Sequence, residues 1–337
     1  MIINTKNIFP ALAVICLLVY SCTGKNQANS KQDHRIPVIL DTDANNELDD
    51  QHAIAYMLFS GQTFDVKGIT VNRTYNGGTI DDQFAEAERI VKLCNCVSKI
   101  RIYKGASNTY DEIADHIAES DFDGAEAVNF IIDCANSTEN QKLVLLPIGK
   151  LTNISLALKK DPSIASKIRI VWLGTNYPEP GEYNFINDTT ALKPILESNV
   201  EFEIVMVRYG KSSGTDAVKA YLKDFQVKMP GKGPKISEPV TGRHGDSFNC
   251  FGDYSVNLFE NFRGNPQTRP LFDMAAVAIV KNPEWADKVI IGAPLYENGK
   301  WINQPDNQRK IAIWENFVTD SIMKDFYYTM ENYKLAE

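Results

Sequence analysis

The stretch at residues 36–51, IPVILDTDANNELDDQ, joins an apolar, β-branched run to five acidic residues and then to a helical pattern. An apolar run of this kind is typical of a strand buried on both faces of a parallel sheet. The five acids within residues 41–50 would repel one another, and capping of the following helix accounts for only one or two of them. The stretch therefore predicts an α/β fold with an oxygen-liganded divalent cation, Ca²⁺ or Mg²⁺, beyond its first strand.

Short β-branched runs alternate with longer helical patterns through the rest of the chain. The expected strands are residues 36–41, 65–71, 99–103, 143–148, 168–173, 202–207 and 287–291. The expected helices are residues 48–59, 81–94, 124–135, 151–159, 189–197 and 214–225, with a last helix from Trp314 to about Tyr333. This order predicts one α/β domain over residues 36–337, with a mostly parallel open sheet and helices on both faces. Ligands of such sheets bind beyond the carboxyl ends of the strands.

Residues 228–270 break this alternation because they are rich in Gly, Pro and Asn. A long irregular segment inside a compact domain is often functional, so we interpret it as an active-site loop region. A plain surface insertion is the alternative.

Composition and charge exclude several classes of protein. Of 337 residues, 44% are hydrophobic and 23% are charged, which is typical of a globular chain and not of a disordered one. Lys and Arg number 35 against 43 Asp and Glu, a net charge of −8 that disfavours binding to nucleic acid. The six cysteines include no C-x-x-C pair, so no metal site on sulfur is expected.

The N-terminal segment has the pattern of an export signal. Residues 1–21 carry Lys6 and then an apolar run over residues 8–20, which suits a signal peptide and is too short to span a bilayer. Leu18 to Cys22 resembles a bacterial lipobox, in which Cys22 would carry the lipid, and residues 22–35 are polar as a tether would be. We therefore expect an exported lipoprotein on the periplasmic or cell-surface side of a bacterial membrane, in contact with that membrane only through Cys22. An ordinary secretory signal is the alternative.

Three further polar segments follow expected strands or open helices. Gly149-Lys150-Leu151-Thr152-Asn153 alone indicates no more than a helix N-terminus. Asn176, Glu182 and Asn184 gather amide and carboxyl groups that could hold sugar hydroxyls, although a generic polar loop is an alternative. Asp273 opens an apolar helix, where it could be a ligand or a cap.

Together these segments resemble the inosine-uridine-preferring nucleoside hydrolase family, over essentially the whole chain after Ile36. The first stretch is similar to the family's motif Asp-x-Asp-Pro-Gly-x-Asp-Asp. Here Ala44 to Leu48 stand where the family has three residues, so the loop is two residues longer while the acids at both ends remain. The spacing of Asn176, Glu182 and Asn184 also matches the family.

The resemblance implies a role for each matching residue. Asp43 would bind the metal and act as the catalytic base that takes a proton from the attacking water, while Asp50, Asp273 and the backbone carbonyl of Thr152 would complete the metal ligands. The expected cofactor is Ca²⁺. Ribose hydroxyls would be held by Asp49 and Asn184, and the 5′ end of the sugar by Asn176 and Glu182. Asn76 is a weaker match for a substrate contact, because Asn72 competes for the same role.

One departure concerns the leaving base. Members that cleave inosine and uridine commonly have a histidine directly before the last aspartate, where this chain has Phe272. His244 is a candidate substitute acid, with a plain surface histidine as the alternative. Candidates for stacking on the base are Tyr209, Phe248, Phe251 and Tyr254, although such aromatics are often core residues.

The function implied is metal-dependent hydrolysis of the N-glycosidic bond of a ribonucleoside, in purine or pyrimidine salvage, by a chain that could form a homodimer or homotetramer. Two other classes stay open. One is a nucleoside- or sugar-binding lipoprotein that has lost turnover, which the absent histidine favours. The other is a phosphatase of the haloacid-dehalogenase type, because Asp41 and Asp43 have the spacing of its nucleophile and acid.

Overall fold

The computed structural model describes residues 1–3, 33–46 and 48–337. The chain divides into a short N-terminal unit, residues 1–33, and a folded unit, residues 34–337. Most of the expected signal peptide, the lipidation site at Cys22 and most of the expected tether lie outside the described residues. Within the described residues, no helix combines the length and apolar character that crossing a bilayer requires.

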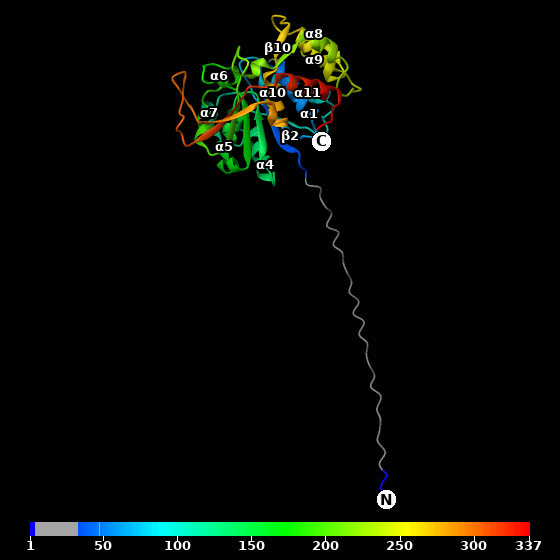
Figure 1. Cartoon of the computed structure of the whole chain (residues 1–337), viewed down its shortest axis with the longest axis vertical. Coiled ribbons are helices and arrows are strands. Elements are labelled where there is room, and N and C mark those ends of the chain that lie inside the picture. Colours follow the sequence, from blue (N-terminus) through cyan, green and yellow to red (C-terminus); the bar gives the residue numbers. More distant parts are fainter. Residues whose placement is uncertain (4–32, 47) are drawn as a thin grey trace. The chain divides into compact units, whose positions relative to one another are not determined.

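The largest sheet in the described part of the chain has eight strands, in the order β11-β14-β6-β5-β4-β1-β2-β3 (Figure 1). Their bounds are β1 (Ile36–Thr42), β2 (Phe64–Val71), β3 (Ile102–Lys104), β4 (Leu143–Pro147), β5 (Ile168–Leu173), β6 (Glu201–Val205), β11 (Asp287–Gly292) and β14 (Lys310–Glu315). Neighbouring strands pair in parallel, except that β11 runs antiparallel to β14 at one edge. The predicted mostly parallel open sheet is confirmed.

Helices cover both faces of this sheet. Successive side chains of a strand point to opposite faces, so each buried strand contributes apolar residues to two cores, and each core is closed by helices. In β1, Val38 and Leu40 belong to one apolar core and Ile39 to the other. The first core takes residues from α1 (Asp49–Leu58), α2 (Ile80–Leu93), α8 (Leu222–Lys228), α9 (Phe251–Glu260), α10 (Phe272–Lys281) and α11 (Thr319–Glu331). The second takes residues from α3 (Tyr110–Ile113), α4 (Ala125–Ser137), α5 (Thr152–Lys160), α6 (Tyr183–Asn187) and α7 (Leu192–Glu197). Figure 1 shows α4, α5 and α7 grouped apart from α1, α10 and α11.

The expectation for the last helix is wrong at its start. The last helix was expected from Trp314, but Trp314 lies in β14 and α11 begins at Thr319. Asn316 has a φ of 56°, a left-handed conformation that ends the strand before the helix begins. The strand β14 itself was not predicted.

The segment between residues 214 and 270 is more ordered than expected. In place of a helix over residues 214–225, a short turn is followed by β7 (Lys219–Tyr221) and then by α8. The expected irregular region contains the hairpin of β8 (Val240–Gly242) and β9 (Gly245–Phe248), the helix α9, and β10 (Thr268–Pro270), which pairs with β7. A second hairpin, β12 (Leu295–Glu297) with β13 (Lys300–Ile302), follows β11.

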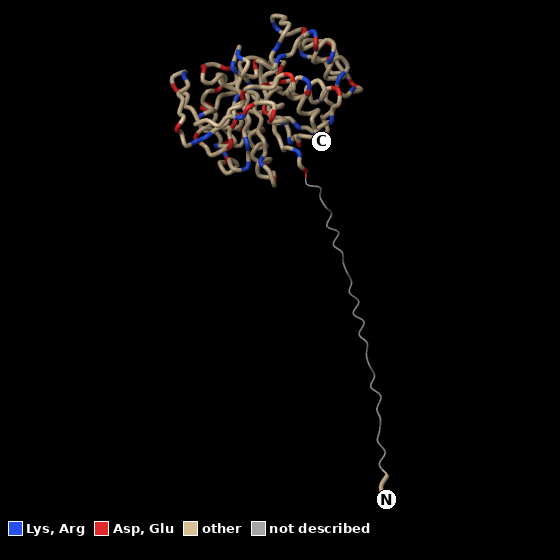
Figure 2. The backbone as a smooth tube through the Cα atoms, in the orientation of Figure 1, with Lys and Arg blue, Asp and Glu red and all other residues tan. Residues whose placement is uncertain are grey.

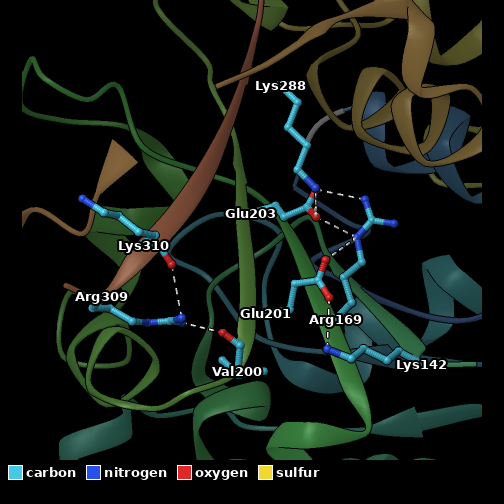
Figure 3. A network of polar contacts seen from close by, with 8 residues as sticks. All are labelled: Lys142, Arg169, Val200, Glu201, Glu203, Lys288, Arg309 and Lys310. Carbon is cyan, nitrogen blue, oxygen red and sulfur yellow. Dashed lines mark hydrogen bonds and ion pairs between the residues drawn. The ribbon is translucent and has the colours of Figure 1, made fainter. Parts of the chain in front are cut away.

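The buried carboxylate of Glu203 connects strands in the half of the sheet that ends at β11 (Figure 3). Glu203 on β6 accepts two hydrogen bonds from Arg169, at 2.8 and 2.9 Å, one from Lys288 at 2.6 Å and one from the indole of Trp314 at 2.6 Å. Burial opposes ionisation of Glu203, but these contacts outweigh it and hold its pKa below the usual range. The three partners lie on β5, β11 and β14, so one carboxylate links four strands. Elsewhere, acidic and basic residues are interspersed along the folded unit (Figure 2).

Candidate active site

An acidic cavity of about 360 Å³ lies beyond the carboxyl ends of the central strands. Six carboxylates line it: Asp43, Asp49, Asp50, Glu182, Asp216 and Asp273. The rest of the wall is mixed polar and apolar: Asn46, Ile148, Leu173, Tyr183, Asn184, Val207, Tyr209, Arg269, Pro270 and Phe272. The position agrees with the rule for ligand sites of parallel sheets.

Three of these carboxylates converge. Asp49 and Asp50 lie in the first turn of α1, and Asp273 lies in the first turn of α10, which packs against α1. One oxygen of each lies within 4.8 Å of the others, and all three residues are buried. The starts of two packed helices thus bring together acids from opposite ends of the chain.

The three carboxylates of this cluster repel one another when ionised, because they are buried and close together. Burial raises the pKa of Asp49 to about 7, and burial together with the neighbouring carboxylates raises those of Asp50 and Asp273 well above the usual value. Three mutually close carboxylate oxygens are the donor set that a hard divalent cation takes, and such a cation would remove the repulsion. The residues present therefore fit a divalent cation.

Asp43 lies in the same cavity, just after β1. Its Oδ2 accepts a hydrogen bond of 2.5 Å from the Thr74 hydroxyl, and burial raises its pKa to about 6. Gly149 lies close against it, since a Cβ at that position would be 3.0 Å from Asp43 Oδ1. A carboxylate fixed on one oxygen, with a pKa near neutrality, can act as a general base.

The loop that is two residues longer than the family motif is held by α2. The backbone amide of Asn45 donates to Gln83 Oε1 at 2.6 Å, and its side chain donates to the carbonyl of Gly77 at 2.8 Å. The carbonyl of Leu48 contacts Nδ1 of buried His52 at 2.5 Å. The described part of this loop is thus held at Asn45 and at Leu48, between Asp43 and Asp49.

Asp41 does not belong to the cavity wall. It is buried, and its carboxylate accepts hydrogen bonds from Thr70 at 2.6 Å, Asn72 at 2.9 Å and Asn153 at 2.7 Å. A phosphatase of the haloacid-dehalogenase type needs its first aspartate as an accessible nucleophile. The structure places Asp41 in a supporting role instead and argues against that alternative.

Glu182 and Asn184, which are predicted to bind the sugar, both line the cavity. The Glu182 carboxylate accepts from the backbone amides of Thr175, Asn184 and Phe185, each at 2.9 Å, and it caps α6. The amide nitrogen of Asn184 donates to the carbonyls of Ile148, at 2.8 Å, and Leu173, at 3.1 Å. A contact of Asn184 with a ligand would therefore use Oδ1 as an acceptor, which suits a sugar hydroxyl.

Four other predicted residues lie outside the cavity wall. Asn176 Oδ1 accepts from the backbone amide of Tyr209 at 3.1 Å, so Asn176 positions a residue of the wall. Thr152 is buried, and its hydroxyl donates to Asp188 at 2.5 Å. Asn76 and His244 line a neighbouring cavity instead. Their assigned roles stay predictions.

The aromatic candidates divide in two. Tyr209 lines the cavity and meets Phe272 edge to face, with ring centroids 5.9 Å apart. Phe251 and Tyr254 are fully buried core residues, so their expected role in stacking on a base is wrong. Phe248 packs on Tyr254, with ring centroids 5.2 Å apart, and does not line the cavity. The sequence analysis did not single out Arg269 or Tyr183, although Arg269 stands only four residues before Asp273.

The cavity and fold define a class: an α/β protein with a carboxylate-rich, cation-competent pocket beyond a parallel sheet. The model of the inosine-uridine preferring nucleoside hydrolase family matches residues 38–319. The chain therefore belongs to that family.

Individual relatives agree. The chain is 34% identical over 91 residues to an inosine-uridine preferring nucleoside hydrolase of Crithidia fasciculata, which covers 25% of this chain and 28% of that one. It is 26% identical over 169 residues to a pyrimidine-specific ribonucleoside hydrolase of Escherichia coli, which covers 48% and 49%. The matched stretches thus span about a quarter to a half of these curated relatives.

Solved structures share the fold. An inosine-guanosine nucleoside hydrolase has a TM-score of 0.69 at 17% identity, covering 89% of this chain and 99% of that one. A purine-preferring ribonucleoside hydrolase from Gardnerella vaginalis has a TM-score of 0.64 at 20% identity, covering 87% and 98%.

Proposed function

We propose that the protein is a metal-dependent N-ribohydrolase that cleaves a ribonucleoside into its base and ribose. The observation that carries the proposal is the convergence of Asp49, Asp50 and Asp273 in the cavity that also holds Asp43. Family membership supports it. We also propose a role in purine or pyrimidine salvage, because this activity releases the free base.

The proposed resident ion is Ca²⁺. Two of the three converging carboxylates, Asp50 and Asp273, would hold it together with Asp43 and the carbonyl of Thr152, while the third, Asp49, would face the ribose. A flexible, all-oxygen ligand set of this kind suits Ca²⁺. When bound, the ion would supply positive charge that makes water a better nucleophile and anchors the ribose diol.

Side chains of the protein would transfer the proton, stabilise the transition state and hold the sugar. Asp43 would take a proton from the attacking water, and its hydrogen bond to Thr74 would hold the carboxylate in place. The carboxylates around the sugar would stabilise the positive charge of the oxocarbenium-like transition state. Asp49 and Asn184 would hold ribose hydroxyls, and Glu182 would lie toward the 5′ end, with Asn176 acting through Tyr209.

The experiment is a screen of nucleosides with the calcium-loaded protein, which measures reducing sugar and free base. Release of both in equal amounts supports the proposal. Tight binding of nucleosides without release would identify the protein as a nucleoside-binding lipoprotein, the alternative that Phe272 favours.

We further propose that the mature protein is a lipoprotein, exported and anchored by acyl chains on Cys22. The lipobox-like sequence supports this, and two or more acyl chains give stable attachment. We expect the wild type to incorporate labelled fatty acid and Cys22→Ser to incorporate none.

Light scattering of the purified protein would decide between a monomer and the proposed homodimer or homotetramer.

A further inference from the structure

A second cavity of about 430 Å³ adjoins the acidic one and shares Asn46 and Arg269 with it. Its charged and titratable lining residues are Arg243, His244, Arg263 and Arg269. None of the described residues that line it is acidic, in contrast to the six carboxylates of the first cavity. The two cavities thus place opposite charges side by side.

Arg269 lies on the wall between them. Its backbone is fixed by the pairing of β10 with β7, opposite Ala220. Its guanidinium lies over the rings of Phe262, at 4.7 Å, and Phe272, at 5.6 Å, which orients its plane. Burial lowers its pKa to about 10, so it stays charged at neutral pH.

The proposed function determines which part of a substrate would meet Arg269. The ribose diol would face Asp49, Asp50 and Asp273, and its 5′ end would face Glu182. The part of the wall left for the base includes Tyr209, Asp216 and the segment Arg269-Pro270 with Phe272, in which Arg269 is the only cationic side chain among the described lining residues. A guanidinium has five N–H donors in a planar fork, so it can bind a protein group and a ligand carboxylate together.

We propose that Arg269 makes the protein specific for ribosides whose leaving base carries a carboxylate. The Arg269 guanidinium would bind that carboxylate where the acidic cavity meets the second cavity. This inference rests on the proposed function. The inference also agrees with the presence of Phe272 beside the base, because a phenylalanine side chain cannot donate a proton to a departing base. A pyridinium carboxylate riboside meets both conditions, because its base leaves without protonation.

The reaction balances without an acid. As the water oxygen bonds to C1′, the bond from C1′ to the ring nitrogen breaks, and its electron pair neutralises the charge on that nitrogen. Asp43 takes the proton lost by water. The products are ribose and the pyridine carboxylate.

Nicotinic acid riboside and nicotinamide riboside are the matched probes, since they differ in a carboxylate against an amide. With the calcium-loaded protein, we expect kcat/KM for the acid to exceed that for the amide at least tenfold. Arg269→Gln should bring this ratio near one, and Arg269→Lys should keep part of it. Arg101→Gln is the control, an exposed arginine just before β3 at the opposite edge of the sheet, and it should leave the ratio unchanged.

A wild-type ratio near one, or a ratio that Arg269→Gln leaves intact, would overturn the inference while the proposed function stands. So would a preference for a 5′-nucleotide over its nucleoside that Arg269→Gln abolishes, because the anion bound would then be a phosphate. If no riboside is hydrolysed, the proposed function fails. Calorimetry with free nicotinate and nicotinamide then decides: binding of nicotinate that needs Arg269 supports the inference, and equal binding overturns it.

Discussion

The carboxylates of Asp49 and Asp273 lie with oxygens within 4.8 Å of each other, although one residue opens α1 near the start of the fold and the other opens α10 near its end. Two helix N-termini favour negative charge at this point, yet a third acid, Asp50, shares it. The folded chain therefore concentrates more negative charge here than helix dipoles alone compensate.

The first prediction concerns the metal. We expect one divalent cation per chain, Ca²⁺, and a melting temperature that rises with added Ca²⁺, since a ligand at a hundred times its Kd stabilises by about 2.7 kcal/mol. Asp273→Asn should remove most of this rise. Metal analysis and thermal melts with and without chelator measure both effects. Stoichiometric zinc, or full activity after chelation, would contradict the prediction.

The pH dependence of the metal-free protein is the second prediction. Burial raises the pKa of Asp43 to about 6 and of Asp49 to about 7, whereas unfolded aspartates titrate near about 3.9. Between these values the folded state binds more protons at these two groups than the unfolded state, so their contribution to stability falls as the pH rises. We expect denaturant midpoints of the chelated protein to decrease from about pH 4 to about pH 7. With saturating Ca²⁺ the decrease should vanish or reverse, and a midpoint that rises with pH without metal would refute this.

Asp43→Asn is the third prediction. The amide keeps the size of the side chain and its contact with Thr74 but cannot accept a proton from water. Turnover should fall by about 10²- to 10⁴-fold. Asp133→Asn, an exposed residue of α4, is the control and should behave as wild type. Calcium content must be measured beside the rates, and an active, metal-loaded Asp43→Asn protein would contradict the role of Asp43.

The fourth prediction concerns Glu203, whose contacts with Arg169 and Lys288 Figure 3 shows and which also accepts from Trp314. Glu203→Gln leaves Arg169 and Lys288 without their shared carboxylate. It should lower the free energy of unfolding by about 3 kcal/mol, the lower end of the range for breaking a buried ion pair, because the Lys288 side chain is partly exposed. Glu201→Gln removes ion pairs of 3.1 Å to Lys142 and 3.8 Å to Arg169 from a side chain that is 42% exposed, and should cost under about 1 kcal/mol. Because the folded pKa of Glu203 is lowered, its contribution should be lost as the pH falls through that pKa. Equal losses for the two variants in urea unfolding would show that burial does not matter here.

Much of the sheet and of the acidic site is predictable from the sequence, because both depend on local patterns. The apolar run before Asp41 indicates a buried strand by itself, and the acids that follow it must lie at the carboxyl end of that strand. The helix expected over residues 214–225 is wrong because β7 gains a partner in β10, a pairing that local helix propensity does not include. Arg269 was missed for the same reason. Its approach to the cavity depends on that pairing and on contacts with Phe262 and Phe272.

The last prediction concerns the proton for the leaving base. Phe272 stands where relatives of the family often have an acid, so a base that must be protonated should leave slowly, while a good leaving group should not. We expect p-nitrophenyl riboside to exceed inosine and uridine in kcat by more than about 10²-fold, the lower bound for a missing general acid.

His244 is the rival acid, but the structure makes it a poor one. It lies on the neighbouring cavity and not on the acidic one, and burial together with the charge of Arg243 lowers its pKa, so that it is mostly neutral at pH 7. His244→Ala should therefore leave the kcat values of both kinds of substrate close to wild type. Fast cleavage of inosine that collapses in His244→Ala would show that the segment between β8 and β9 supplies the proton when substrate is bound, and the expectation based on Phe272 would be wrong.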